Sequence, residues 1–378
     1  LSGVTTYIYF RMSSEVKNRM VGYLCGFLYA VSFFSQRADR FIWVVGPIFV
    51  LTASFLYMVA RISKKNIYSK LDGLLMGVLV GLGLSFHYQY GAIFGAFLLL
   101  FLSKQFRKGI SFGYCASFCG GVLFFFLPLI VFELRHNFYN LRGVGLLLNY
   151  STERASFLNR FVSIAVAISN NILGLFVSNA NPTSPVFTSL WVVVPVSLLF
   201  ILILFIFYQK NRHSLIGLFA VNTFIVGILM YALFRNNFYY YLFVLQPLVI
   251  LVISFMLLEI KRREKLILSI ICIFTAVNLY TWYHFKPSPT FNQQLEVVEY
   301  IIENARVKPI TVHFESMPSE EYAFLFYYAL RQKNLSYDAV RFSEPWDSNT
   351  NAEYVFLPKQ VNKKNLVAFG PLKIVHND

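Results

Sequence analysis

The stretch VVVPVSLLFILILFIFY, residues 192–208, contains no charged side chain. An α-helix needs about 20 apolar residues to cross the ~30 Å hydrocarbon core of a bilayer, and similar blocks recur up to residue 283 between short basic loops. The strands of a membrane β-barrel would instead alternate apolar and polar residues over about ten positions. The pattern therefore predicts an all-α polytopic membrane protein.

The composition also indicates that lipid is the solvent. Apolar residues make up 57% of the 378 residues, charged residues make up 13%, and the mean hydropathy is +0.57. A soluble domain carries about 25% charged residues. The net charge of +15 comes mostly from short loops, which is typical of membrane topology and does not indicate nucleic-acid binding. The four cysteines, Cys25, Cys115, Cys119 and Cys272, all fall inside apolar blocks. This position predicts neither a disulfide framework nor a zinc site.

We predict about ten membrane spans followed by a soluble tail. The chain starts at Leu1 with an apolar block of about half the usual length, so we expect that a preceding segment is absent and that no signal peptide can be sought. The spans run approximately over residues 1–10, 20–35, 44–60, 71–86, 90–103, 110–132, 189–208, 214–234, 239–258 and 266–283.

Lysines mark one end of these spans. By the positive-inside rule, the loops that carry them face the cytoplasm. The alternation holds only if residues 161–180, which include Asn170 and Asn171, form an interfacial or re-entrant helix and do not cross. The basic residues of the cytoplasmic loops are Arg11, Lys17, Arg19, Arg61, Lys64, Lys65, Lys70, Lys104, Arg107, Lys108, Lys210, Arg212, Lys261, Arg262, Arg263 and Lys265.

The opposite end carries arginine in place of lysine. The planar guanidinium group suits phosphate and carboxylate recognition, although a single arginine also serves as an interfacial anchor. As a set, these arginines predict an anionic ligand on the outer face. They are Arg37, Arg40, Arg135, Arg142, Arg154, Arg160 and Arg235.

The outer loop at residues 33–43 places Asp39 between Arg37 and Arg40. An ionised carboxylate at this depth costs free energy and is usually retained only where it pairs with a cation or has a functional role. Asp39 is therefore either an orienting group or base for a substrate hydroxyl, or the partner of a neighbouring arginine.

The next outer turn, residues 85–91, holds His87, Tyr88 and Gln89 between two apolar blocks. Aromatic faces beside polar edges favour a sugar site, whereas a lone histidine in a membrane protein is also a common structural hydrogen-bonding residue. No second histidine or carboxylate follows at ligand spacing, so no metal site is predicted.

The longest outer loop of the membrane region begins at Glu133, and long ordered loops tend to carry function. Glu133 and Arg135 either pair with each other or belong to a site. The neighbouring polar residues predict a phosphate cradle at the bilayer surface. These are Arg135, His136, Asn140 and Arg142, and Arg235 in the loop before the tyrosine run 239–241 is a further candidate.

These segments resemble bacterial relatives of the dolichyl-phosphate-mannose protein mannosyltransferases, which share the GT-C fold with aminoarabinose transferases. The likeness extends over nearly the whole chain. Relatives commonly have a polar residue and proline after the tryptophan, where this chain has Val44 and Val45 before Gly46 and Pro47. The resemblance is carried by residues 30–34, 40–43, 86–88, 132–136 with Asn140, and 239–241.

The resemblance implies a multi-pass glycosyltransferase of the cell membrane. It would transfer a sugar, with inversion, from a polyprenyl-phosphate-linked donor to a lipid, glycan or protein acceptor on the extracytoplasmic face. A carboxylate would deprotonate the acceptor, while basic residues or a divalent cation would stabilise the departing lipid phosphate. Asp39 is the catalytic candidate in this chain, and we expect the main family carboxylate in a loop that would precede Leu1. The candidates for donor phosphate or substrate binding are Arg37, Arg40, His87, Tyr88, Gln89, Glu133, Arg135, His136, Asn140, Arg142 and Arg235.

The composition changes after Lys286, where a proline-containing linker begins and eleven of the eighteen acidic residues follow. The pattern predicts helices over 292–306 and 319–332 and strands over 310–314, 354–357 and 372–375. We therefore expect a small extracytoplasmic α/β domain over residues 284–378, which recognises the acceptor or serves as a structural cap.

Two other functions remain open from the sequence. A transporter or lipid flippase would also need many spans, but such proteins usually place charges or broken helices near the middle of the membrane, often in two similar halves. A non-catalytic relative of the transferases is the third possibility.

Overall fold

In the computed structural model the chain divides into two compact units, Leu1–His284 and Phe285–Asp378. The first unit is helical, and the second contains helices and a five-stranded sheet. The structure describes residues 2–40, 46–65, 68–138, 142, 157–176, 187–233, 239–260, 264–284, 291–305, 310–314, 320–336, 340–343, 354–357, 366–369 and 372–376.

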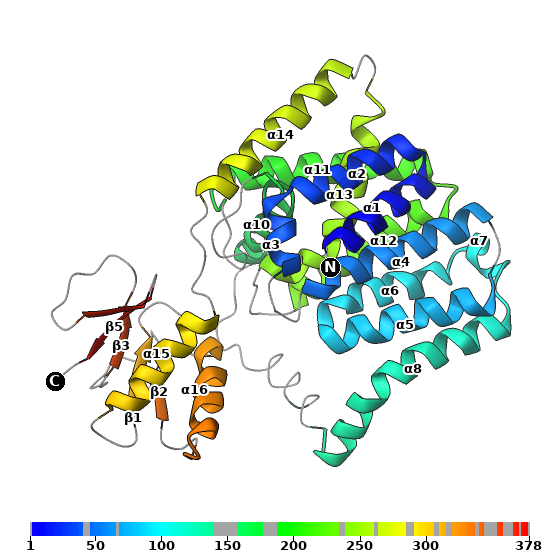
Figure 1. The fold of residues 1–378 in the computed structure, drawn as a ribbon. Helices are drawn as coiled ribbons and strands as arrows, with labels where there is room; N and C mark the ends of the chain where they lie inside the picture. Colours follow the sequence, from blue (N-terminus) through cyan, green and yellow to red (C-terminus); the bar gives the residue numbers. More distant parts are fainter. Residues whose placement is uncertain are drawn as a thin grey trace. The chain divides into compact units, whose positions relative to one another are not determined.

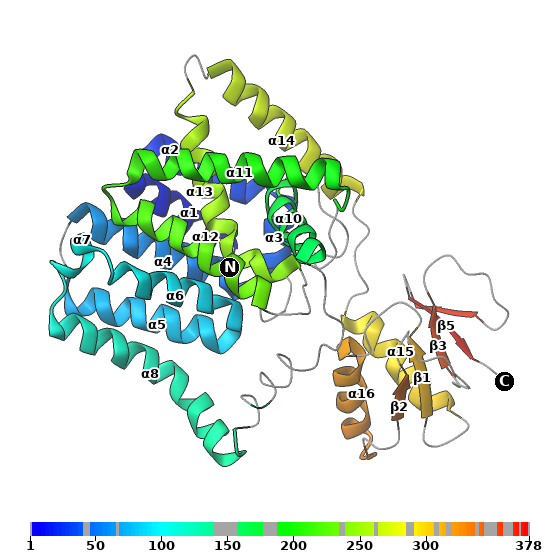
Figure 2. The same cartoon turned by 180° about the vertical axis from the view of Figure 1, so that it is seen from behind.

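The first unit is a bundle of helices (Figures 1 and 2). Helix α4 is central, with 67% of its most apolar stretch buried, whereas α8 and α14 are 11% buried and lie at opposite edges of the bundle in both views. The elements are α1 (Ser2–Val16), α2 (Arg19–Val31), α3 (Phe33–Arg40), α4 (Gly46–Lys65), α5 (Lys70–Phe86), η1 (Tyr88–Tyr90), α6 (Gly91–Leu100), α7 (Lys104–Arg107), α8 (Phe112–Arg135), α10 (Phe157–Leu173), α11 (Leu190–Asn211), α12 (Leu215–Leu233), η2 (Tyr239–Leu245), α13 (Gln246–Leu257) and α14 (Glu264–His284).

Helical segments occupy the ten regions in which spans are predicted. Among the described residues, five helices are long and apolar enough to cross a membrane: α4, α8, α11, α12 and α14. Helix α2, η1 with α6, and η2 with α13 are apolar but shorter. The chain is thus helical and has the apolar helices of a membrane protein, while the crossing of all ten segments stays a prediction.

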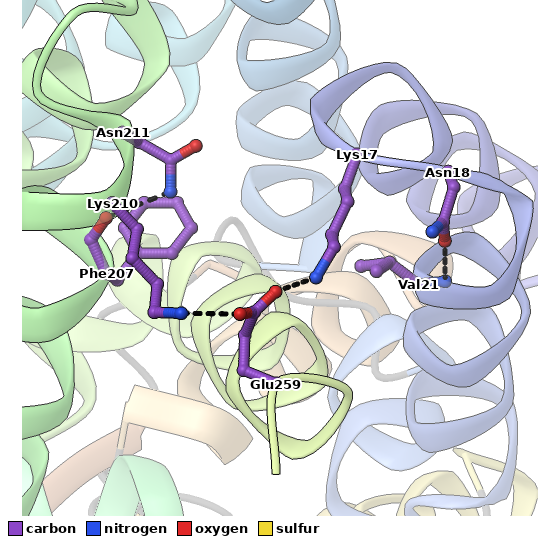
Figure 3. Close-up of polar contacts among 7 residues, drawn as sticks. All are labelled: Lys17, Asn18, Val21, Phe207, Lys210, Asn211 and Glu259. Atoms are coloured by element: carbon purple, nitrogen blue, oxygen red, sulfur yellow. Dashed lines mark hydrogen bonds and ion pairs between the residues drawn. The ribbon is translucent and has the colours of Figure 1, made fainter. Parts of the chain in front are cut away.

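The lysine-bearing loops meet at one end of the bundle. Glu259, just after α13, binds Lys17 between α1 and α2 and also Lys210 near the end of α11 (Figure 3). Direct contacts therefore place these predicted cytoplasmic loops together. Further contacts at the same end are Lys64 Nζ to Glu15 Oε2 (3.1 Å), Leu215 N to Ser63 Oγ (3.0 Å) and Gln105 Nε2 to His213 O (3.0 Å).

Helix α10 begins and ends at the opposite end. Near its start, the carbonyl oxygen of Ser163 accepts a hydrogen bond from Tyr231, in the last turn of α12. Just beyond its C-terminus, the carbonyl oxygen of Leu175 accepts one from Ser32, at the end of α2. Both partners lie away from the lysines. The segment predicted as interfacial or re-entrant therefore stays at one end of the bundle and does not run its length.

Helices α5 and α8 pack backbone to backbone. Gly73, Gly77 and Gly81 follow one another at four-residue intervals along α5 and face α8. A Cβ atom at Gly77 would lie 2.1 Å from the carbonyl oxygen of Phe118. Small residues at this spacing let membrane helices approach closely. This close contact holds α8 along α5, and α8 carries Glu133 and Arg135 at its C-terminal end.

The second unit contains α15 (Phe291–Asn304), α16 (Glu320–Gln332) and the strands β1 (Ile310–Phe314), β2 (Val340–Ser343), β3 (Tyr354–Leu357), β4 (Leu366–Phe369) and β5 (Leu372–His376). The strand order is β2-β1-β3-β5-β4; β1 is parallel to β2 and β3, and β5 is antiparallel to β3 and β4. Val297, Ile301, Val312 and Phe326 lie in its buried core. The sequence pattern predicts β1, β3 and β5 but not β2 and β4.

Candidate functional site

The end of the bundle opposite the lysines contains a helix break between α2 and α3. Ser32 ends α2 and also accepts a hydrogen bond at its Oγ from the backbone N–H of Ser35 in α3. Because the helix is interrupted, the N–H of Phe33 bonds outside it and donates to Asn278 Oδ1 of α14 at 2.7 Å. Asn278 Nδ2 and Ser32 Oγ both donate to the carbonyl oxygen of Leu175. A buried backbone break thus finds its partners in neighbouring elements.

A second break separates α5 from α6 at His87. Its ring Nδ1 accepts a hydrogen bond from the backbone N–H of Gln89 at 3.2 Å and caps η1. Burial lowers the pKa of His87 from 6.5 to about 4. The ring is therefore neutral at pH 7, and because Nδ1 is an acceptor, its hydrogen is on Nε2.

The third irregular segment is η2, which leads into α13. The N–H of Val244 donates to Gln89 Oε1 at 3.4 Å, which joins η2 to the His87 turn. Gln246 is fully buried, and its Nε2 donates to Ser35 Oγ of α3 at 2.9 Å. Its Oε1 is buried without a hydrogen-bond partner in the described part of the chain. This oxygen is an acceptor held ready for a donor, since buried amide oxygens are normally paired.

A small cavity lies beside these residues and has room for about one water molecule. It is lined by Tyr88, Gln89, Ala92, Gly227, Met230, Tyr231 and Val244. The mixture of tyrosines, an amide and backbone groups is suited to hydrogen bonding with uncharged polar atoms.

Helix α10 closes this end of the bundle and lies beside α3 in both views (Figures 1 and 2). The side chain of Asn170 donates to the carbonyl oxygen of Phe187 and accepts from its N–H, at 2.7 and 3.0 Å. Asn171 donates to Ala167 O, while its buried Oδ1 has no partner among the described residues. Together with Gln246, Asn171 gives this end two buried amide oxygens without partners.

The structure places the predicted site residues in three groups. Arg37, Asp39 and Arg40 lie in α3, although a loop was expected there; the reason is that Ser32 caps a new helix directly after α2. Their side chains lie outside the described residues, as do Asn140 and Arg235 entirely. His87, Tyr88 and Gln89 form the turn described above.

The remaining candidates lie at the C-terminal end of α8. Glu133 is buried and Arg135 is exposed. His136 is exposed, and its ring stacks on that of Phe132 with centroids 4.1 Å apart. Its Nδ1 lies 2.8 Å from the carbonyl oxygen of Phe132. His136 thus contacts its own helix, and the predicted phosphate cradle stays a prediction.

The backbone after α8 turns sharply. Asn137 and Phe138 have φ values of 53° and 61°, and the N–H of Phe138 donates to the carbonyl oxygen of Glu133 at 2.7 Å. A left-handed asparagine followed by such a bond is a common helix end. Positive φ at a bulky phenylalanine is rare. The N–H of Arg142 in turn donates to Phe138 O, which places this exposed arginine next to the turn.

The polar residues that join these elements were not predicted from the sequence. Gln246 and Asn278 lie inside predicted spans, and Ser32 lies within the last turn of another. Amides inside apolar blocks were an available signal, because such side chains commonly bond between membrane helices. The sequence pattern did not indicate which backbone groups these amides would bind.

No group of three or more His, Cys, Asp or Glu side chains that could hold a metal ion occurs among the described residues. A scan of protein-family models finds none that matches this chain, and a search of curated proteins finds no similar sequence.

Proposed function

We propose that this chain is an integral membrane glycosyltransferase of the GT-C type. It would move a sugar from a polyprenyl-phosphate-linked donor to a lipid, glycan or protein acceptor on the extracytoplasmic face of the cell membrane. The main supporting observation is that the helix breaks at Ser32, His87 and Gln246 meet at the end opposite Lys17 and Lys210, where Arg135 ends α8.

Irregular backbone at membrane depth is tolerated where it is buried in protein or lines a cavity. Here the breaks bring neutral amides, hydroxyl groups and an uncharged imidazole together at the end of the bundle where α8 ends at Arg135. Neutral hydrogen-bonding groups suit sugar hydroxyls, and guanidinium groups suit a lipid phosphate. Both kinds of group, at one end of the bundle, support a polyprenyl-phosphate sugar as the proposed donor.

The reaction would be a single displacement. The acceptor oxygen attacks the anomeric carbon, the bond from that carbon to the phosphate oxygen breaks, and polyprenyl phosphate leaves with the electron pair. The acceptor's proton passes to a carboxylate, for which Asp39 in α3 is our candidate. Arg135 and Arg142, both exposed, would stabilise the charge on the departing phosphate.

The finer architecture belongs to the same proposal. All ten helical segments would cross the membrane, with α10 interfacial. The loops that contain Lys17 and Lys210 would face the cytoplasm, and the unit Phe285–Asp378 would be an extracytoplasmic α/β domain.

The distribution of charge favours a transferase over a transporter or lipid flippase. Among the described residues of the first unit, the buried carboxylates are Asp72, in the first turn of α5, and Glu133, in the last turn of α8. Transporters usually place ionisable groups near the middle of the membrane. The described breaks also lie at one end of the bundle.

The test is transfer by the purified full chain in liposomes from a panel of polyprenyl-phosphate sugars, with release of polyprenyl phosphate as the readout. Arg135→Ala and Arg142→Ala should each lower turnover by about 100-fold, because each removes charge-assisted hydrogen bonds of about 1.5–3 kcal/mol. Arg19→Ala, at an exposed position at the start of α2 and so at the lysine-bearing end, is the control and should retain activity. Wild-type turnover in both Arg135→Ala and Arg142→Ala would refute the phosphate role.

A second experiment distinguishes a glycosyltransferase from a lipid flippase. Fluorescent polyprenyl-phosphate sugar placed in one leaflet would redistribute without chemical change if the chain only moved lipid. Redistribution with no released polyprenyl phosphate across the donor panel would overturn the proposed function.

A further inference from the structure

The loop between α6 and α8 is anchored at the lysine-bearing end. Phe106 of α7 is buried, and its ring packs edge-on against Tyr68 and Phe97, each with centroids 5.5 Å apart. Gly109 lies directly against Tyr68, because a Cβ atom at Gly109 would be 1.9 Å from that ring. The backbone that carries Lys104 and Lys108 is therefore held in one place by aromatic packing.

An open concavity of about 660 Å³ lies between this loop and the neighbouring helix ends. Ser63, at the end of α4, accepts the N–H of Leu215 at the start of α12, and Gln105 donates to His213 O. These bonds join three loops around the concavity. The residues that line the concavity are Ser63, Lys104, Gln105, Lys108 and Gly109. They include two ammonium groups and no carboxylate.

Lys104 and Lys108 differ from three lysines at this end that are paired with a carboxylate. Lys17 and Lys210 bind Glu259, and Lys64 binds Glu15. Within the described part of the chain, neither Lys104 nor Lys108 has a carboxylate within salt-bridge distance. Like charges four residues apart on one turn repel each other. An anion between them would remove this repulsion.

We propose that this concavity binds the phosphodiester headgroup of an anionic phospholipid. Basic pockets between membrane helices on the cytoplasmic side favour such headgroups. Leu102 and Phe112, which flank the loop, are 75% and 89% exposed, so apolar side chains that acyl chains can cover lie within the same segment. This apolar rim favours a lipid over a soluble phosphate. The site is separate from the proposed transfer site, which lies at the other end of the bundle.

The experiment uses the purified full chain in nanodiscs with and without phosphatidylglycerol. Bound phosphatidylglycerol is counted by native mass spectrometry against phosphatidylcholine. Lys104→Gln/Lys108→Gln should weaken phosphatidylglycerol binding by about 30-fold, since each basic residue near an anionic lipid surface contributes a factor of roughly five in affinity and the two factors multiply. Both positions are exposed, and equal thermal unfolding in phosphatidylcholine alone verifies the fold.

The matched control is Arg19→Gln/Lys65→Gln, which removes the same charge from exposed positions at the same end. It should bind phosphatidylglycerol like the wild type. Equal loss in both double variants would show a diffuse electrostatic effect and overturn the site. Inorganic phosphate is titrated in a third arm; if it displaces phosphatidylglycerol at millimolar concentration, the ligand is a soluble phosphate and the lipid assignment is wrong.

Discussion

Lowering the pH from 7 to 5 should destabilise the bundle through His87. The ring caps η1 with an unprotonated Nδ1, and it lies in the turn between two predicted spans. Protonation removes that acceptor and places a charge in a partly buried position. The folded chain therefore resists protonation more than the unfolded chain, as the lowered pKa of about 4 expresses.

The sign and size follow from proton linkage. Above pH 6.5 the ring is neutral in both states, and its pKa shift has little effect on stability. Between 6.5 and about 4 only the unfolded chain binds the proton, so the free energy of unfolding falls by about 1.36 kcal/mol per pH unit. From pH 7 to 5 the loss is about 2 kcal/mol, and solvent screening of the partly exposed ring lowers it to about 1–2 kcal/mol.

The assay is thermal unfolding of the purified chain in detergent at pH 7, 6 and 5. His87→Asn is the informative variant, because asparagine retains a capping oxygen and does not titrate. The wild type should lose about 1–2 kcal/mol more than this variant between pH 7 and 5. His136→Asn, at an exposed position, should follow the wild type. Parallel pH profiles for wild type and His87→Asn would refute the reasoning.

Two further predictions concern the end of the bundle opposite the lysine-bearing loops. Asn278→Leu leaves the N–H of Phe33 unpaired and should lower the free energy of unfolding by about 1–3 kcal/mol in chemical denaturation. Asn211→Leu, whose side-chain amide donates to Phe207 O within its own helix, should lower it less, and equal effects would contradict the bridging role of Asn278. In a cysteine-free background, an impermeant thiol reagent should label Arg160→Cys from outside and Lys65→Cys only from the cytoplasm, and the reverse labelling would invert the topology.

Much of the first unit was predictable because its signals are local. A continuous apolar block such as residues 192–208 predicts a helix from its length alone, and α11 forms there. The lysines of separate loops each indicate the same side, and Lys17 and Lys210 indeed share Glu259. The interfacial position of α10, expected from charge alternation, stays a prediction.

The polar layer was less predictable because it depends on distant pairs. Gln246 meets Ser35 across 211 positions of sequence, and Asn278 meets Phe33 across 245. No periodicity encodes such a pairing. Residues 33–40 also read as a polar loop, whereas Ser32 caps them into a helix. Local polarity therefore identified the region but not its conformation.

The sequence by itself determined where the apolar helices lie and which loops carry lysine, and it predicts lipid as the solvent, because hydropathy and charge act residue by residue. Only the tertiary structure decided that the helix breaks at Ser32, His87 and Gln246 come together, and that Lys104 and Lys108 line an open concavity while Lys17 and Lys210 share Glu259. The physical reason is that a buried backbone group or an unpaired charge is defined by its partners, and those partners lie far away in the chain.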